Sequence, residues 1–106
     1  MALSSSAQRV QDFLKQNGYS HTVVEHNQST RSSAEAAAAI GCTVEQIAKS
    51  LVFMTRRTKQ PIMVIASGIN RVNTKRVGEA LGEALDRADP DFVHDVTGYA
   101  IGGVPP

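Results

Sequence analysis

Two features of this 106-residue sequence bring together residue types that can do chemistry: a lysine inside an apolar segment and a glycine–proline run. Lys49 lies between the apolar residues Ile47–Ala48 and the apolar run Leu51–Phe53. A charge in such surroundings is costly unless it is used, and an ammonium group there can bind a phosphate or a ribose at the edge of a cleft. The alternative is that this side chain reaches solvent and complements the carboxyl end of a helix.

The run Gly102–Pro106 can bring backbone groups close to a ligand. Gly102 and Gly103 carry no side chain, so a ligand can approach their backbone, while Pro105 and Pro106 stiffen the loop. Unpaired N–H groups in such a loop can polarise an ester carbonyl or stabilise its oxyanion, and no catalytic side chain would be required. An ordinary connecting loop is the alternative, because glycine and proline are common in turns.

The other reactive residues match no standard catalytic or metal-binding pattern. The three histidines, His21, His26 and His94, lack metal-ligand spacing, and the sequence has no nucleophile elbow, P-loop or dinucleotide-binding fingerprint. Cys42 is the only cysteine, which excludes an intrachain disulfide and a multi-cysteine metal site. It could pair with a histidine as a nucleophile, but a lone cysteine after a glycine is more typical of a small buried apolar residue. We therefore expect no metal and no cofactor.

Positive charge is local in this chain. The formal net charge of +1 excludes the large basic excess of a protein that coats nucleic acid non-specifically. Two basic groups occur nevertheless, Arg56, Arg57 and Lys59 in one and Arg71, Lys75 and Arg76 in the other. They could be ordinary solvated side chains, or they could hold a nucleic-acid backbone through salt-dependent phosphate contacts.

Capping patterns and hydrophobic periodicity predict the elements that must position these residues. A first helix is expected from the capping box at Ser5 to the stop at Asn17–Gly18, followed by a strand over Tyr19–Glu25. The later elements are, in chain order, a helix from Ser32 to Gly41, a short helix from Thr43 that runs directly into a strand over Leu51–Met54, a hairpin to a strand over Ile62–Ala66, a helix from Asn73 or Thr74 to Gly82, a strand near Ala84–Leu85 and a helix from Asp89–Pro90 to Gly98.

The chain is expected to form one domain spanning residues 1–106, with 42% hydrophobic residues. Its apolar stretches are far shorter than the ~20 residues of a membrane span, and residues 1–6 lack the pattern of a secretory signal. A cytoplasmic location and no membrane partner are therefore expected. The apolar, strand-like segment Tyr99–Ile101 near the end suggests that the chain is cut short, because termini are usually polar and frayed.

Several segments, in order, resemble the YbaK/prolyl-tRNA synthetase editing-domain family. They are Gln46–Phe53, Ala66–Gly68 and Thr97–Pro106, supported by Ser29–Arg31 and Glu35–Ala37. The resemblance covers nearly the whole chain, and the ordered combination is far more specific than any one motif. It implies an α/β fold with a YbaK-like mixed, barrel-like β-sheet and surrounding helices, of which the C-terminal part is missing here.

The same resemblance implies a trans-acting aminoacyl-tRNA deacylase, which hydrolyses the ester of mischarged tRNA. Lys49 corresponds to the family's functional lysine, and Gly102 and Pro106 frame its substrate loop. The implied site consists of Lys49, Gly102 and Gly103 as catalytic residues, Thr30, Ser67, Gly68, Val104, Pro105 and Pro106 as substrate-binding residues, and Arg56, Arg57 and Lys59 as tRNA-binding residues.

The implied mechanism is substrate-assisted. The N–H groups of Gly102 and Gly103 hold the aminoacyl carbonyl while the terminal ribose hydroxyl positions or activates water, and Cys42 has no catalytic role. In some relatives a cysteinyl substrate uses its own thiol instead, and the sequence does not choose between these routes. The expected partner is mischarged tRNA, and association with an aminoacyl-tRNA synthetase stays open.

Two other function classes stay open at this point. One is a non-catalytic tRNA-binding module with the same fold. The other is a structural protein in which Lys49 is a surface residue and the basic groups only favour solubility. The edited amino acid is not specified by these motifs, because pockets distinguish small side chains by only about 1–3 kcal/mol per methylene.

Overall fold

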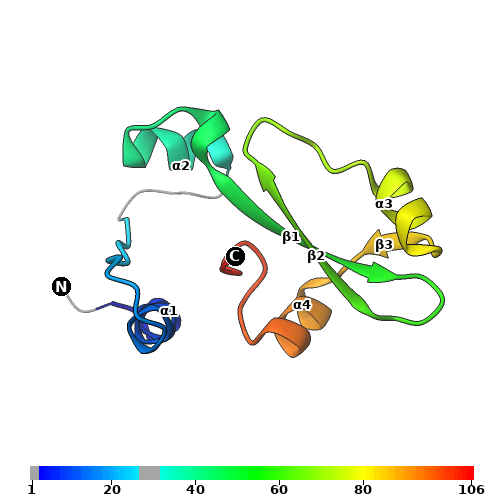
Figure 1. Cartoon of the computed structure of the whole chain (residues 1–106), viewed down its shortest axis with the longest axis horizontal. Helices are drawn as coiled ribbons and strands as arrows, with labels where there is room; N and C mark the ends of the chain where they lie inside the picture. The colour runs from blue at the N-terminus through cyan, green and yellow to red at the C-terminus, as the bar shows by residue number, and fades with distance from the viewer. Residues whose placement is uncertain (1–2, 27–31) are drawn as a thin grey trace.

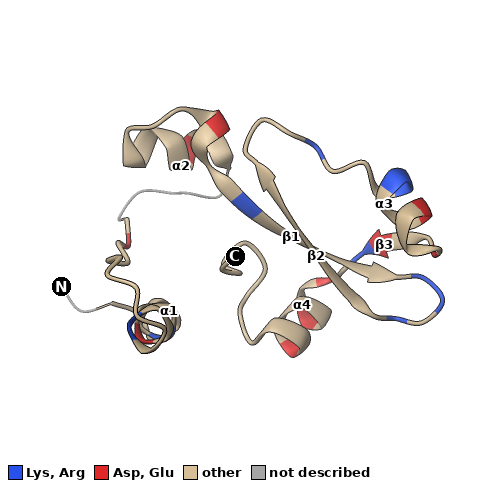
Figure 2. Cartoon of the chain, viewed as in Figure 1, with Lys and Arg blue, Asp and Glu red and all other residues tan. Residues whose placement is uncertain are grey.

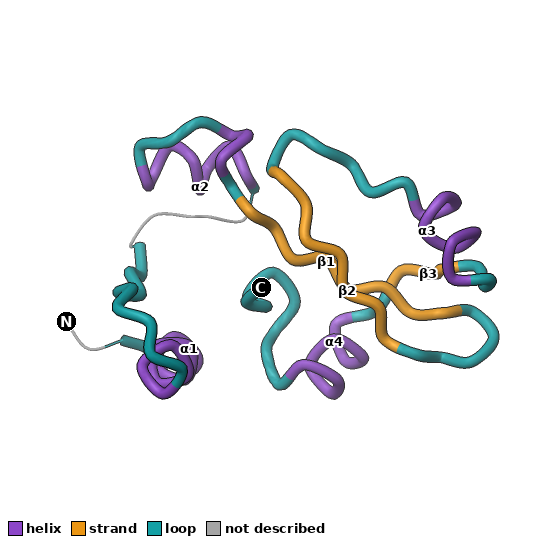
Figure 3. The backbone as a smooth tube through the Cα atoms, in the orientation of Figure 1, coloured by secondary structure: helices purple, strands orange, loops and turns teal. Residues whose placement is uncertain are grey.

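The computed structural model describes residues 3–26 and 32–106 of the chain. Its centre is a three-stranded antiparallel sheet in the order β2-β1-β3, with helices arranged around it (Figure 1). The strands are β1 (Ala48–Thr55), β2 (Pro61–Ser67) and β3 (Leu85–Arg87). The helices are α1 (Ser5–Gln16), α2 (Ser33–Ile40), the 3-10 turn η1 (Val44–Gln46), α3 (Thr74–Leu81) and α4 (Pro90–Thr97), as Figure 3 shows.

The hairpin of β1 and β2 confirms the sequence prediction and extends it. The two strands pair in register from Ala48 opposite Ser67 to Met54 opposite Pro61, so each is longer than its apolar run. β3 then pairs with the last part of β1, placing Leu85 opposite Thr55. β1 is therefore the central strand, paired with β2 along its length and with β3 near its C-terminal end.

The helix ends follow the predicted capping residues. The Ser32 side chain accepts a hydrogen bond from the Glu35 N–H at the start of α2, which ends at Gly41. Asn73 and Asp89 cap α3 and α4 in the same way. The cap of α1 is Ser4, one residue before the predicted start, because its hydroxyl accepts the Ala7 N–H.

The predicted strand over Tyr19–Glu25 is wrong. A single side chain takes the place of a partner strand: the Gln11 amide donates to the His21 carbonyl oxygen over 3.0 Å and accepts the Val23 N–H over 2.7 Å. Backbone groups away from water need partners, and here a buried glutamine supplies them. Periodicity could not reveal this, because the partner lies on a helix.

Two further local predictions need correction. The predicted helix after Thr43 is only the 3-10 turn η1, although Thr43 and Gln46 do form the expected capping box. Lys49 is therefore the second residue of β1 and does not lie at the end of a helix. The apolar segment Tyr99–Ile101 is not a strand, because it enters a turn that the Gly103 N–H closes on the Ala100 carbonyl oxygen.

The α/β class is confirmed, while the sheet is simpler than the mixed, barrel-like one expected. All strand pairs among residues 3–26 and 32–106 are antiparallel, and the sheet they form is open. The chain exposes 7722 Å², against about 5,700 Å² for a compact protein of this mass. Apolar side chains of β2 such as Met63 and Ile65 are accordingly exposed. The structure holds together around a small core that includes Ala37, Leu85 and Val93.

Candidate active site

Lys49 and the glycine–proline loop, far apart in the sequence, line one cavity. It has a volume of about 730 Å³, within the usual range of small-molecule sites, and its walls come from α2, the start of β1 and the C-terminal loop. Lys49, Gly102 and Val104 are among its lining residues. Figure 1 shows the C-terminal loop turning back toward β1, which explains how the two segments come to share a cavity. The structure therefore brings together part of the site predicted from sequence.

The environment of Lys49 leaves its charge available. The residue is half-buried in β1, opposite Ala66 of β2. Within residues 3–26 and 32–106, its ammonium group has no hydrogen-bond or ion-pair partner. Figure 2 shows a basic position near the start of β1, separate from those of the β1–β2 turn. A half-buried ammonium group beside a cavity is suited to bind a phosphate or a ribose.

The two glycines of the loop have different roles in the structure. Gly102 has a φ of 83°, in the left-handed region that favours glycine, and it lines the cavity. Across the described part of the chain its N–H has no hydrogen-bond partner. The Gly103 N–H donates to the Ala100 carbonyl oxygen over 2.9 Å and so closes the turn. Of the two predicted donors, Gly102 is the one that this conformation leaves available.

Ser67 and Gly68 lie outside the cavity and fasten η1 to the end of β2. The Ser67 hydroxyl donates to the Glu45 carbonyl oxygen over 2.6 Å, and the Gly68 N–H donates to the Ile47 carbonyl oxygen over 2.8 Å. A Cβ atom at Gly68 would lie only 2.4 Å from the Val44 carbonyl oxygen. These contacts fix the segment that leads into Lys49.

Three residues of the predicted substrate site remain, and the structure describes two of them. Pro105 is half-buried and Pro106 is exposed, and neither lines the cavity. Thr30 lies outside the described residues, with the rest of the segment 27–31.

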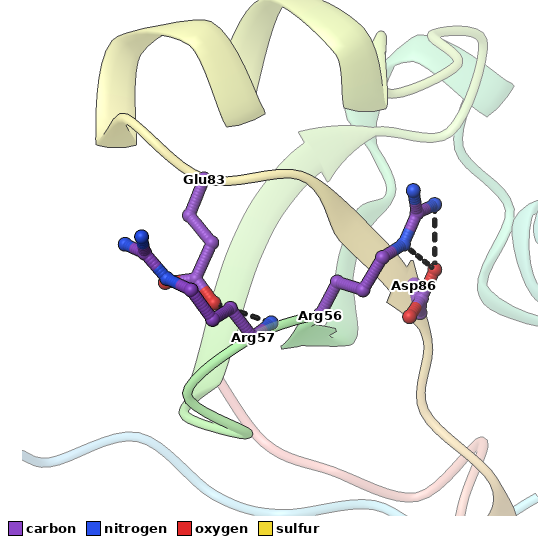
Figure 4. A network of polar contacts seen from close by, with 4 residues as sticks. All are labelled: Arg56, Arg57, Glu83 and Asp86. Carbon is purple, nitrogen blue, oxygen red and sulfur yellow. Dashed lines mark hydrogen bonds and ion pairs between the residues drawn. The ribbon is translucent and has the colours of Figure 1, made fainter.

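The predicted tRNA-binding residues Arg56, Arg57 and Lys59 lie at the opposite end of β1, in the turn to β2. Figure 4 shows Arg56 and Arg57 there. From Lys49 to Arg56 the strand spans about 23 Å. The Arg56 guanidinium forms an ion pair with Asp86 over 2.9 Å. The structure thus places this basic group away from the Lys49 cavity.

The carboxylates of Glu83 and Asp86 bond to this turn, and these bonds lower the pKa of each. The hydrogen bond from Arg56 lowers the pKa of Asp86 below its ordinary value, against partial desolvation. The Glu83 carboxylate accepts the N–H groups of Arg57 and Thr58, each over 2.6 Å. Desolvation acts to raise the pKa of Glu83, but the hydrogen bonds from Thr58 and Arg57 together outweigh it, so the net shift is downward.

The sequence missed several residues of the cavity wall. Val24 and His26 line it from the segment after α1, and Ile40 and Cys42 line it from the end of α2. Cys42 is half-buried. Its burial is therefore intermediate between that of a buried apolar residue and that of an exposed nucleophile, the two interpretations that the sequence allowed. The alanine run of α2 weakens its hydrophobic periodicity, so the sequence did not show which face of this helix lies toward the cavity.

Among the described residues, no three His, Cys, Asp or Glu side chains are grouped to hold a metal ion. No helix among them is long and apolar enough to cross a membrane.

Comparison with known proteins assigns the family. The model of the aminoacyl-tRNA editing domain matches residues 27–106, which include the whole sheet, α2 and the C-terminal loop. The chain belongs to the aminoacyl-tRNA editing domain family. This confirms the resemblance seen in the sequence and leaves only α1 and the segment after it before the matched part of this editing domain.

Individual relatives agree with this assignment. The editing domain is 33% identical to the uncharacterized protein YwhH of Bacillus subtilis (strain 168) over 84 residues, which are 79% of this chain and 53% of that protein. A crystal structure assigned provisionally as a trans-editing enzyme for prolyl-tRNA synthetase is 44% identical, with a TM-score of 0.87 over 98% of this chain and 66% of that one. The crystal structure of hypothetical protein APE2540 is 31% identical, with a TM-score of 0.80 over 92% of this chain and 65% of that one. The editing domain thus spans about half the length of its curated relative and about two thirds of these solved chains.

Proposed function

We propose that this editing domain is a trans-acting deacylase that hydrolyses the ester of mischarged tRNA. The observation that carries the proposal is the shared cavity of Lys49 and Gly102. The Lys49 ammonium group and the Gly102 N–H both line or border this cavity. Neither has a hydrogen-bond or ion-pair partner among the described residues. Family membership supports an aminoacylated tRNA end as the ligand, and similarity to the trans-editing structure supports action on tRNA charged by another protein.

Lys49 supplies the charge of this site. Its ammonium group binds the terminal phosphate or ribose of the tRNA and holds the ester beside the loop. The apolar residues Val24, Ile40 and Val104 of the cavity wall then contact the amino-acid side chain. We propose further tRNA contacts from Arg57 and Lys59, and keep Thr30 as a substrate contact proposed from sequence alone.

The loop acts on the ester carbonyl. Water adds to the carbonyl carbon while the Gly102 N–H donates to the oxygen that becomes negative. The neighbouring ribose hydroxyl positions the water. The carbon–oxygen ester bond then breaks, and the ribose oxygen leaves with a proton taken from the water. The Gly103 N–H becomes a second donor only when it leaves the Ala100 carbonyl oxygen.

A second candidate is a non-catalytic module that binds tRNA with the same fold. The closed turn favours it, because the Gly103 N–H is engaged within the protein and only one of the two expected donors is available. In either case the partner is tRNA in the cytoplasm, and a synthetase that supplies the mischarged tRNA is a further candidate partner.

Deacylation and tRNA binding measured on the same samples test both candidates. The chain is mixed with tRNAs mischarged with small amino acids, chiefly alanyl- and cysteinyl-tRNA species, and ester loss is compared with buffer alone. We expect hydrolysis of at least one species. Binding without hydrolysis supports the second candidate, and the absence of both contradicts both.

A further inference from the structure

Helix α1 lies before the part of the chain that the family model matches, yet it contacts two segments that lead into the wall of the Lys49 cavity. The contacts come from Arg9 and Gln11. Residues two positions apart point in different directions from a helix, so one helix can hold two segments at once.

Arg9 holds the segment that leads into the glycine–proline loop. Its guanidinium donates to the Gly98 carbonyl oxygen over 2.9 Å and stacks on the Tyr99 ring, with its central carbon 4.4 Å from the ring centroid. Gly98 ends α4, where the helix presents unpaired carbonyls that favour a cation. A Cβ atom at Gly98 would lie 3.2 Å from an Arg9 nitrogen, so the two residues fit closely.

Two further hydrogen bonds connect the contact at Tyr99 to the loop. The Tyr99 N–H donates to the Thr97 hydroxyl over 3.0 Å, which fixes the start of the segment. The turn closed by the Gly103 N–H on the Ala100 carbonyl oxygen follows at once. Only Ala100 and Ile101 separate the anchored ring from Gly102.

Gln11 holds a second segment that lines the cavity. The residue is 7% exposed, and both of its amide atoms bond to the segment after α1, at His21 and Val23. The neighbouring residues Val24 and His26 line the cavity.

We propose that α1 positions two of the segments that line the candidate active site, the one after α1 and the glycine–proline loop, and that Arg9 is a positioning residue for the Gly102 N–H. Arg9 does not line the cavity, so it acts through Gly98 and Tyr99 and not on the substrate. The structural part stands on the contacts alone, while the effect on catalysis rests on the proposed deacylase function.

Amide NMR spectra test the structural part without any activity. In the ¹H–¹⁵N spectrum of the chain, Arg9→Ala is expected to shift the signals of Gly98, Gly102 and Gly103. The matched control, Lys15→Ala, removes another exposed cation of α1 and should leave these signals in place. Unchanged Gly102 and Gly103 signals in Arg9→Ala would overturn the proposal. Gln11→Leu should shift the amide signals of Val24 and His26. If this substitution of a buried residue prevents folding, the Arg9→Ala spectrum still decides the question, because Arg9 is exposed.

Deacylation kinetics test the catalytic part. Arg9→Ala should lower kcat about fivefold with little change in KM, because the donor is displaced and the binding of the tRNA is not. Tyr99→Phe keeps the ring and should retain wild-type kcat, Tyr99→Leu should match Arg9→Ala, and the double variant Arg9→Ala/Tyr99→Leu should fall no further. A kcat equal to that of Lys15→Ala would overturn the catalytic part. A wild-type chain without hydrolysis contradicts the deacylase function instead, and the NMR spectra then decide whether α1 positions the loop.

Discussion

A cation lies near each end of strand β1, Lys49 within its start and Arg56 directly after its last residue, and the two have different surroundings. At the first end, Lys49 lies half-buried beside a cavity, with no partner among residues 3–26 and 32–106. At the other end, exposed Arg56 forms an ion pair with Asp86, and Glu83 holds the adjoining turn through backbone N–H groups (Figure 4). A cation already paired within the protein is engaged there, even if an exposed pair adds little stability, whereas a cation without a partner beside a cavity is available for a ligand. The comparison therefore separates an Arg56 end of β1, where the cation is paired, from a Lys49 end, where it lies beside a cavity.

The largest effect on stability is expected from Gly68→Ala, at the Lys49 end. The new methyl group would meet the Val44 carbonyl oxygen at 2.4 Å and the Ser33 side chain at 2.8 Å, so η1 must move away from β2. Overpacking of this kind costs about 2 kcal/mol of unfolding free energy. Urea unfolding measures it, with Gly103→Ala as the control, because a Cβ atom there meets its nearest neighbour at 3.5 Å. Equal midpoints for the two variants would show that η1 is not held by this contact.

A smaller and pH-dependent effect is expected from Glu83→Gln, at the Arg56 end. The pKa values of Glu83 and Asp86 are lowered in the folded chain, so the unfolded chain binds more protons as pH falls. The stabilisation is present above the unfolded pKa values, near 4, and is lost as pH falls through the folded values. The urea midpoint of the wild type should therefore drop from about pH 5 downward.

Glu83→Gln should lower the midpoint at neutral pH and make this acid drop shallower. The control is Glu79→Gln, which changes an exposed carboxylate of α3 that has no hydrogen-bond partner among the described residues. If both variants show the same pH profile, Glu83 does not hold the turn.

The smallest effect is expected from Arg57→Ala on tRNA binding. The Arg57 side chain is exposed, and its charge acts on the nearby Glu83 carboxylate without forming an ion pair in the described part of the chain, so it can also reach a phosphate. Its removal should reduce the slope of log affinity against log salt by about 0.8. The slope is measured by filter binding at several salt concentrations, with Lys15→Ala as the control. An unchanged slope would place the tRNA backbone elsewhere on the molecule.

The elements read from the sequence were those whose signals are local. Caps such as Ser32, Asn73 and Asp89 fixed three helix starts, because the cap side chain and its N–H partner lie three residues apart. The hairpin followed from two apolar runs around a polar turn. The strand over Tyr19–Glu25 failed because its partner is one buried glutamine on α1, which no strand pattern contains. Long-range bonding of this kind is set by tertiary packing and not by propensity.

For the candidate site, residue chemistry alone left two interpretations open, because a lysine in an apolar segment can also reach solvent and a glycine–proline run can be an ordinary loop. The family resemblance pointed to Lys49 and Gly102, and these two residues line the same cavity. The other predicted residues show the limits of motif reasoning. Ser67 and Gly68 fasten η1, and the Gly103 N–H closes a turn, because the same residue types serve packing and turn formation as well as binding.

The central claim is tested most directly by deacylation measured for Lys49→Ala and Arg56→Ala side by side. With a mischarged tRNA that the wild type hydrolyses, Lys49→Ala is expected to lower kcat/KM about 10²-fold, because the charge that holds the tRNA end is removed. Arg56→Ala should stay within about fivefold of the wild type, since it removes only an exposed ion pair. Circular dichroism of both variants checks that the fold is kept. Equal losses in the two variants, or full activity in Lys49→Ala, would contradict the assignment of the active site to the Lys49 end of β1.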